Sequence, residues 1–287
     1  MLQDLKKIAE SARFYLWPVA AGNTVAVALG VGAGSSNAVL LGVALCCLAS
    51  FGFLINDLLD RRVDKANSAK RLEYARPQAI SGAWGAAFLF LLVGLLCSLC
   101  VSTRCLQVCV WISLGLFLYS SVVRPILLAA TILAALLGTS PLWVPLFLWR
   151  ESAIPSVAAL FSGVYLMFVA REIILDIKDE EGDRLSGRHT FPTIYGWRIA
   201  SMLASTAKVA SGGVLLKACF DLSSGISSLV SQLLLWLLVL CFLYLGIVPA
   251  LKVSLASSPR EMIAAYIRQS RVAMALLPII LLFVFCG

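Results

Sequence analysis

Long apolar stretches, separated by short polar segments, run along almost the whole sequence. A helix that crosses a bilayer needs roughly 20 largely apolar residues, because every backbone amide must find its partner within the segment. The pattern therefore predicts an all-α integral membrane protein that forms a single domain over residues 1–287. Nine stretches meet the requirement, near residues 14–34, 38–56, 84–102, 106–123, 125–148, 154–172, 197–219, 227–251 and 270–286.

Composition agrees with a membrane protein, and the distribution of charge predicts its orientation. The chain is 61% hydrophobic and only 13% charged, with a net charge of +8. Basic residues resist translocation, and 19 of the 23 fall on one side if the N-terminus is cytoplasmic. We therefore expect a cytoplasmic N-terminus, cytoplasmic acidic loops and a C-terminus on the opposite side. Lys208 falls inside the seventh predicted span, where it would either face a cavity or reach toward an interface.

The basic balance does not indicate a nucleic-acid partner. The cations lie in short loops beside the predicted spans, and no aromatic-basic recognition module is visible. Anionic lipid headgroups and phosphate ligands explain them better. Four cysteines between residues 97 and 109 lie in apolar spans without a neighbouring histidine, so we interpret them as small hydrophobic residues rather than metal ligands.

Two acidic motifs share one spacing, DxxDxxxD, and corresponding aspartates are 119 positions apart. The first covers residues 56–64, after the second predicted span, and the second covers residues 176–183, after the sixth. This duplication predicts two pseudo-repeated four-helix units plus one helix. The acidic residues of the two motifs are Asp57, Asp60, Asp64, Asp176, Asp179 and Asp183.

The spacing of each motif indicates a metal site. Positions i, i+3 and i+7 lie along one face of a helix, so three carboxylates project into one small volume. Their mutual repulsion requires a hard cation, and Mg²⁺ prefers carboxylate, water and phosphate oxygens. The substrate should therefore bring phosphates, for which Arg76, Arg188 and His189, after the motifs, are candidate donors. The alternative is a pair of solvated acidic loops.

The segments NDLLDRRVD, ARPQAISG, REIILDIKDEEGD and GRHTFPTIYG together resemble the UbiA-type membrane prenyltransferases. The resemblance implies nine transmembrane helices around a central cavity, in which both motifs hold Mg²⁺ and an isoprenyl diphosphate. It makes the six aspartates the metal-binding and catalytic residues. The candidate diphosphate-binding residues are Asn56, Arg76, Arg124, Arg188 and His189.

The second motif looks closest to geranylgeranylglyceryl-phosphate geranylgeranyltransferases and to chlorophyll- and homogentisate-type members, which favours a lipid-type acceptor. The sequence departs from the family at His189, where Lys or Arg is frequent, and at Thr131, where Asn is frequent. Its segment between the first motif and the following Arg-Pro pair is longer. Five aromatic residues on even-numbered spans are candidates to line the cavity: Phe51, Phe53, Tyr119, Tyr165 and Phe168.

Together these features predict a Mg²⁺-dependent transferase that moves an isoprenyl group, from geranylgeranyl or farnesyl diphosphate, to a hydrophobic or aromatic acceptor. One alternative is a membrane terpene cyclase of the same fold, which would form a cyclic product from the donor alone. Another is a transporter of Mg²⁺ or organic anions, although the acids cluster at one face rather than at the bilayer midplane. Dependence on an acceptor separates the first two, and flux without turnover would indicate the third.

Overall fold

The structure is a computed structural model that describes residues 2–60, 77–123, 126–149, 155–223, 226, 228–256 and 259–286. This described part consists of helices and short connections and contains no strand. Its N-terminal elements are α1 (Leu2–Ala12), η1 (Phe14–Leu16), α2 (Trp17–Gly30), α3 (Ser35–Leu59), α5 (Pro77–Val101), α6 (Thr103–Leu118) and η2 (Tyr119–Val123). Its C-terminal elements are α7 (Leu127–Gly138), α8 (Ser140–Trp149), α9 (Pro155–Leu185), α10 (Phe191–Ser223), α11 (Leu229–Leu255) and α12 (Pro259–Cys286).

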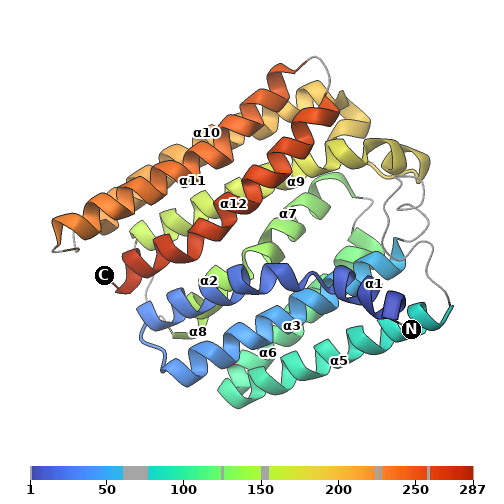
Figure 1. Cartoon of the computed structure of the whole chain (residues 1–287), viewed down its shortest axis with the longest axis horizontal. Coiled ribbons are helices and arrows are strands. Elements are labelled where there is room, and N and C mark those ends of the chain that lie inside the picture. Colours follow the sequence, from blue (N-terminus) through green and yellow to red (C-terminus); the bar gives the residue numbers. More distant parts are fainter. Residues whose placement is uncertain are drawn as a thin grey trace.

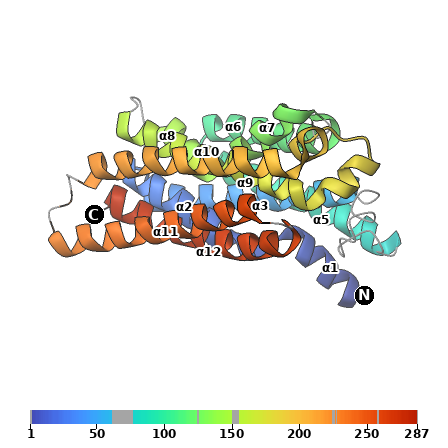
Figure 2. The ribbon, with the colours of Figure 1, turned by 90° about the horizontal axis from the view of Figure 1, so that it is seen from above.

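Most of the helices lie side by side with their long axes roughly aligned, as Figure 1 shows. Seen from above in Figure 2, α6, α7 and α8 lie on one side of the bundle, and α11 and α12 lie on the opposite side. The short helix α1 extends away from the bundle at the end where the chain starts. The C-terminal end of α3 and the second half of α9 lie toward that same end (Figure 1).

Seven helices in the described part are long and apolar enough to cross a membrane. The pair α7 and α8 forms an eighth candidate span, which is bent by 63° where the two helices meet. The predicted first span is a three-residue 3₁₀ turn followed by α2, whose 14 residues are shorter than a bilayer crossing requires. The all-α membrane architecture is therefore confirmed, whereas the predicted number of nine spans is not.

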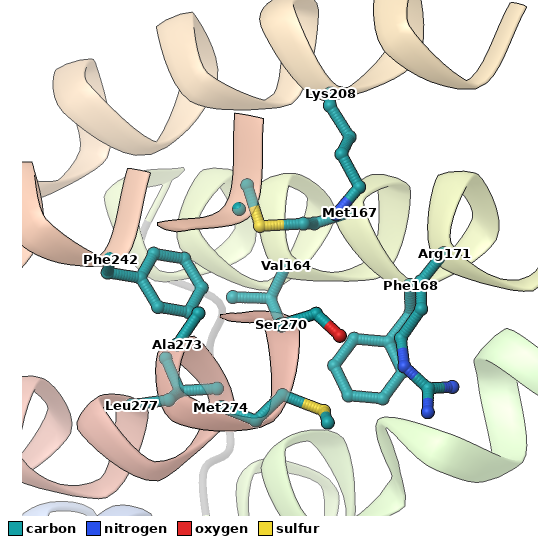
Figure 3. A pocket seen from close by; sticks show the side chains of 11 residues that line it. Val164, Met167, Phe168, Arg171, Lys208, Phe242, Ser270, Ala273, Met274 and Leu277 are labelled. Carbon is teal, nitrogen blue, oxygen red and sulfur yellow. The ribbon is translucent and has the colours of Figure 1, made fainter. Parts of the chain in front are cut away.

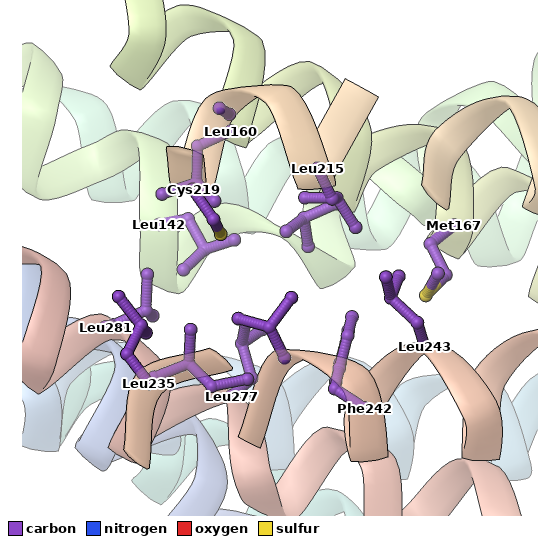
Figure 4. Close-up of a cluster of buried hydrophobic side chains, with 14 of the residues drawn as sticks. Leu142, Leu160, Met167, Leu215, Cys219, Leu235, Phe242, Leu243, Leu277 and Leu281 are labelled. Atoms are coloured by element: carbon purple, nitrogen blue, oxygen red, sulfur yellow. The ribbon is translucent and has the colours of Figure 1, made fainter. Parts of the chain in front are cut away.

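The core is divided between the two halves of the bundle. Side chains from α9, α10, α11 and α12 form most of the largest buried cluster, which also includes Ala26 and Val27 of α2 and Leu142 of α8, and part of which Figure 4 shows. In the N-terminal half, α3 packs against α1 and α5 through Phe51, Leu54 and Ile55. Large apolar side chains that remain exposed, such as Trp111 and Phe220, are what a lipid-facing surface contains.

Two backbone features near the acidic motifs depart from helical geometry. Arg13, between α1 and η1, has φ 53°, a left-handed conformation that residues other than glycine rarely adopt. Gly196, near the start of α10, has φ 80° and ψ 156°, so the first turn of α10 is offset from the rest of the helix. Both positions orient chain segments that meet the acidic ends of α3 and α9.

Candidate active site

The two acidic motifs meet through Arg188, which lies in the segment between α9 and α10. Its Nη2 donates a hydrogen bond to Oδ1 of Asp60, at the end of α3. Its Nη1 lies 3.5 Å from Oδ1 of Asp183, in the last turns of α9. Asp60 and Asp183 are 1% and 4% exposed, so a single guanidinium links two nearly buried carboxylates from the two halves of the chain.

Asp57, the first acid of the first motif, is paired with an arginine from the N-terminal segment. Nη2 of Arg13 donates a hydrogen bond of 3.3 Å to Oδ1 of Asp57, which is 1% exposed. The same guanidinium lies 4.1 Å from the ring centroid of Phe53, within the range of a cation–π contact. The left-handed backbone of Arg13 turns the chain between α1 and η1, and the Arg13 side chain extends from this turn toward Asp57. Sequence reasoning did not identify Arg13, because 44 positions separate it from its partner.

The acids of the second motif that precede Asp183 are more accessible. Asp176 and Asp179 are half-buried on α9, and the carboxylate of Asp179 lies 3.2 Å from Nζ of its neighbour Lys178. One turn before Asp176, Glu172 accepts a hydrogen bond of 2.5 Å from Arg171. Glu172 therefore extends the acidic face of α9 one turn further into the bundle.

The structure describes two of the five remaining predicted site residues. Asp64, Arg76 and Arg124 lie outside the described residues. Asn56 is half-buried on α3, beside Asp57, and His189 is exposed in the segment after Arg188. The metal-binding and diphosphate-binding roles of these five residues, like those of the other candidates, stay predictions.

The chemistry of the donor set fits Mg²⁺. The site offers carboxylates from two helices, which are the hard oxygen ligands this ion prefers. Within the described part of the chain, no three acidic, histidine or cysteine side chains gather into a group that could hold a metal ion by themselves. Mg²⁺ usually takes only one or two carboxylates and completes its octahedron with water and phosphate oxygens, so this arrangement suits a metal that arrives with a phosphorylated substrate.

A small cavity lies beside residues 164–171 of α9, which precede the acidic residues and lie deeper in the bundle. Side chains from α9, α10, α11 and α12 line it, among them Phe168, Arg171 and Lys208, as Figure 3 shows. Lys208 is 2% exposed, so it faces the interior rather than an interface, which decides between the two alternatives left open by the sequence. Of the five aromatic candidates for a cavity wall, Phe168 lines this one.

The UbiA prenyltransferase family model matches residues 15–285, which is nearly the whole chain. The chain belongs to the UbiA prenyltransferase family. This membership confirms the resemblance that the acidic motifs and their flanking segments indicated, and it agrees with a multi-pass membrane protein built from apolar helices.

Relatives within the UbiA family include digeranylgeranylglyceryl phosphate synthases. The one from Thermococcus gammatolerans is 33% identical over 175 residues, which are 60% of this chain and 61% of the relative. The match thus spans about three fifths of that protein's length.

Two solved structures share the UbiA fold with this chain. A structure described as digeranylgeranylglyceryl phosphate synthase in membranes has a TM-score of 0.64 and 20% identity, and covers 99% of this chain and 98% of its own. A UbiA homologue from Archaeoglobus fulgidus, bound to DMAPP and Mg²⁺, has a TM-score of 0.67 and 16% identity, and covers 96% of this chain and 99% of its own. At these identities the two structures establish the fold.

Proposed function

We propose that this protein transfers an isoprenyl group from an isoprenyl diphosphate, in the presence of Mg²⁺, to the hydroxyl group of a lipid acceptor that carries a glycerol phosphate. The observation that carries this proposal is the contact of Arg188 with both Asp60 and Asp183. It brings the two acidic motifs to one place, at the end of a helical bundle that belongs to the UbiA family.

The class of donor and acceptor is supported by the relatives. The Archaeoglobus fulgidus homologue binds an allylic diphosphate together with Mg²⁺, which supports the same class of donor here. Several relatives are named digeranylgeranylglyceryl phosphate synthase, a name that implies addition of a geranylgeranyl group to geranylgeranylglyceryl phosphate. We therefore assign geranylgeranyl diphosphate as the preferred donor and geranylgeranylglyceryl phosphate as the preferred acceptor.

The reaction breaks the bond between C1 of the donor and its diphosphate, and forms an ether bond between C1 and the acceptor oxygen. The acceptor hydroxyl loses its proton, and diphosphate leaves. Asp57, Asp60 and Asp183, with Asp64, Asp176 and Asp179 as further ligands, would hold Mg²⁺, which would supply positive charge to the leaving diphosphate.

The protein's own residues stabilise and protect this step. The Arg188 guanidinium gives up its contact with a carboxylate and donates two hydrogen bonds to diphosphate oxygens. The further diphosphate contacts that we propose are Arg76, Arg124, Asn56 and His189. The apolar interior of the bundle takes the isoprenyl chain and keeps water from the developing allylic cation. We place the acidic end and the N-terminus at the cytoplasmic side, where water-soluble Mg²⁺ is available.

Mass spectrometry of the products of the purified protein tests this function. The protein in detergent is incubated with Mg²⁺, geranylgeranyl diphosphate and geranylgeranylglyceryl phosphate, or with farnesyl diphosphate and phenolic acceptors in parallel. We expect the digeranylgeranyl ether as the main product, and its loss in Asp57→Asn and Asp176→Asn. The control is Asp221→Asn, which changes an exposed carboxylate that pairs with Lys217 near the far end of α10.

The alternatives give different products in the same experiment. Cyclic hydrocarbons or alcohols that form without an acceptor would replace the transferase by a cyclase. A prenylated phenol as the main product would keep the transferase and overturn the lipid acceptor. If no donor is consumed, flux of Mg²⁺ or organic anions in sealed vesicles becomes the measurement, and the enzyme assignment fails.

A further inference from the structure

Lys208 is a cation in the middle of a membrane-spanning helix, α10, and its side chain extends into the cavity of Figure 3. It is 2% exposed, and within the described part of the chain its ammonium makes no hydrogen bond or ion pair. Its Nζ lies 5.0 Å from the ring centroid of Tyr266 on α12, a cation–π contact that compensates only part of the lost hydration. A buried charge without a counter-charge is strongly unfavourable, so such a residue indicates a function.

Two further donors beside Lys208 also lack a partner among the described residues. These are Nε of Arg171 on α9 and the hydroxyl group of Tyr266, which is 0% exposed. Arg171 lines the same cavity as Lys208, and its charge is balanced by Glu172 at 2.5 Å. With Lys208 protonated, the cluster carries a net charge of +1, and it is rich in unused donors. A ligand that satisfies it must supply negative charge and acceptor oxygens.

The walls of the cavity allow it to adapt to a ligand. As it stands, its free space of about 20 Å³ is sufficient for a water-sized molecule. Met167 and Met274 lie on its wall, and methionine side chains are unbranched and change conformation readily. The remaining wall is largely apolar, with Phe168 beside Arg171 (Figure 3). The site thus combines a cationic end with an apolar surround, which suits the anionic head of an amphiphile.

The cluster lies at a suitable depth for the acceptor. Arg171 precedes Asp176 by five residues on α9, which corresponds to roughly 7.5 Å along the helix axis. In a glycerol phosphate the anion is separated from the neighbouring hydroxyl group by a few bonds. A phosphate beside Arg171 and Lys208 would therefore hold that hydroxyl group between the cluster and the acidic motifs, where the donor's C1 is placed.

From these observations we infer that Lys208, Arg171 and Tyr266 form an anion site that binds the phosphate of the lipid acceptor, separate from the diphosphate site at the acidic motifs. This inference rests on the proposed transfer to a glycerophosphate lipid. It makes Lys208 a residue that determines specificity for a phosphorylated acceptor over the corresponding alcohol.

The test measures binding of two matched lipids in the absence of donor. Tryptophan fluorescence of the purified protein reports the affinity for geranylgeranylglyceryl phosphate and for geranylgeranylglycerol, which lacks the phosphate. We expect Lys208→Met to weaken binding of the phosphate form about tenfold to a hundredfold, the range for a contact with a charged group. Binding of the alcohol should be unchanged. Lys208→Arg should retain most of the preference, and Lys217→Met is the control, because it removes an exposed lysine from the same helix.

A second readout separates a binding role from a structural one. Without ligand, Lys208→Met should unfold at a temperature roughly 2–4 °C higher than the wild type, because an unpaired buried charge is replaced by an apolar side chain. A lower unfolding temperature together with an unchanged preference for the phosphate form would show that Lys208 only supports packing, and would overturn the inference.

Further binding experiments separate two questions: which lipid supplies the anion, and whether the proposed function or the anion site has failed. Lysophosphatidic acid and monoacylglycerol form a second pair with and without phosphate. If both phosphate forms bind through Lys208 but the wild type transfers isoprenyl groups to neither, the anion site stands, and its assignment to the acceptor is overturned together with the proposed acceptor. If the phosphate makes no difference to the affinity of the wild type in either pair, the anion site itself is overturned.

Discussion

The ends of α3 and α9 carry the same acidic spacing but hold their carboxylates differently. On α3, Asp57 and Asp60 are each 1% exposed, and each meets an arginine from a distant part of the chain. On α9, Asp176 and Asp179 are half-buried, and the cation beside Asp179 is its exposed neighbour Lys178. Asp57 and Asp60 are therefore fixed before a substrate arrives, as is Asp183 through Arg188, whereas Asp176 and Asp179 of the second motif retain room to adjust to one.

The two halves also differ in the helical turns that precede the acidic motifs. Arg171 on α9 corresponds, at the same offset of 119 positions, to Gly52 on α3. A Cβ atom at Gly52 would lie 2.6 Å from Leu116 on α6, so this part of the N-terminal half is filled by an apolar side chain. The duplicated halves thus share the DxxDxxxD spacing, but among the described residues the cationic cluster beneath it belongs to the C-terminal half.

Removing one carboxylate from each motif is the strongest test of this comparison. We expect Asp60→Asn to lower kcat/KM about a thousandfold, because it loses both a metal ligand and the contact that holds Arg188. Asp179→Asn should lower it by only about tenfold to a hundredfold, since water or a neighbouring acid can take its place. Steady-state kinetics of both variants with geranylgeranyl diphosphate give the measurement. Equal losses would contradict a fixed first motif and an adjustable second one.

Arg188 joins the two motifs, so its substitution separates them. Arg188→Met should lower kcat/KM about a hundredfold and raise the KM of the donor, because two buried carboxylates lose their shared cation and the diphosphate loses a donor pair. Arg188→Lys should recover part of the loss. Arg184→Met is the control, since Arg184 is exposed and pairs with Glu180 within α9. An unchanged donor KM in Arg188→Met would contradict a diphosphate contact.

Arg13 tests whether the first motif is held from outside its own helix. Arg13→Gln should lower the free energy of unfolding by about 1–2 kcal/mol, because the buried charge of Asp57 loses its ion pair with Arg13, although Arg13 is itself partly exposed. Saturating Mg²⁺ should reduce this deficit, since the metal would neutralise Asp57 where Arg13 no longer does, and would therefore stabilise the variant more than the wild type. Arg104→Gln is a matched control, because Arg104 lies over the ring of Phe147 as Arg13 lies over Phe53. If Mg²⁺ does not change the loss of stability in Arg13→Gln, Asp57 lies outside the metal site.

The smallest expected effect concerns the close packing of Leu116 against Gly52 in the N-terminal half. Gly52→Ala should destabilise the protein by about 1 kcal/mol, because Leu116 must move to admit the methyl group. Gly85→Ala, on the exposed face of α5, meets no atom within 4 Å and should be neutral or slightly stabilising. Thermal unfolding in detergent compares the two, and equal shifts would show that the close approach at Gly52 is unimportant.

The sequence predicted the features that depend on local pattern. Hydropathy located the membrane helices, and the repeated DxxDxxxD spacing picked out the acids of each motif. The resemblance to a known family implied that both motifs serve one site, and in the structure Arg188 contacts Asp60 of one motif and Asp183 of the other. Hydropathy also averages over bends, so it did not show the 63° break between α7 and α8 or the shortness of α2.

Contacts between distant segments were not predictable from one sequence. The pairing of Arg13 with Asp57 depends on a left-handed turn after α1, and no local signal marks that turn. Lys208 stood out as a polar residue in an apolar span, but its neighbour Tyr266 comes from a helix 58 positions later. Such clusters are set by how helices pack, and their members look like ordinary residues in their own spans.

The length of α9 has a consequence for how the donor arrives. Its 31 residues span roughly 46 Å, whereas the hydrocarbon layer is about 30 Å thick, so the end that carries the second motif stands in the headgroup region. The charged head of an amphiphile with a long isoprenoid tail lies in the same headgroup region. Capture is then a lateral encounter in two dimensions, and the rate of turnover should follow the mole fraction of donor in the lipid rather than its bulk concentration.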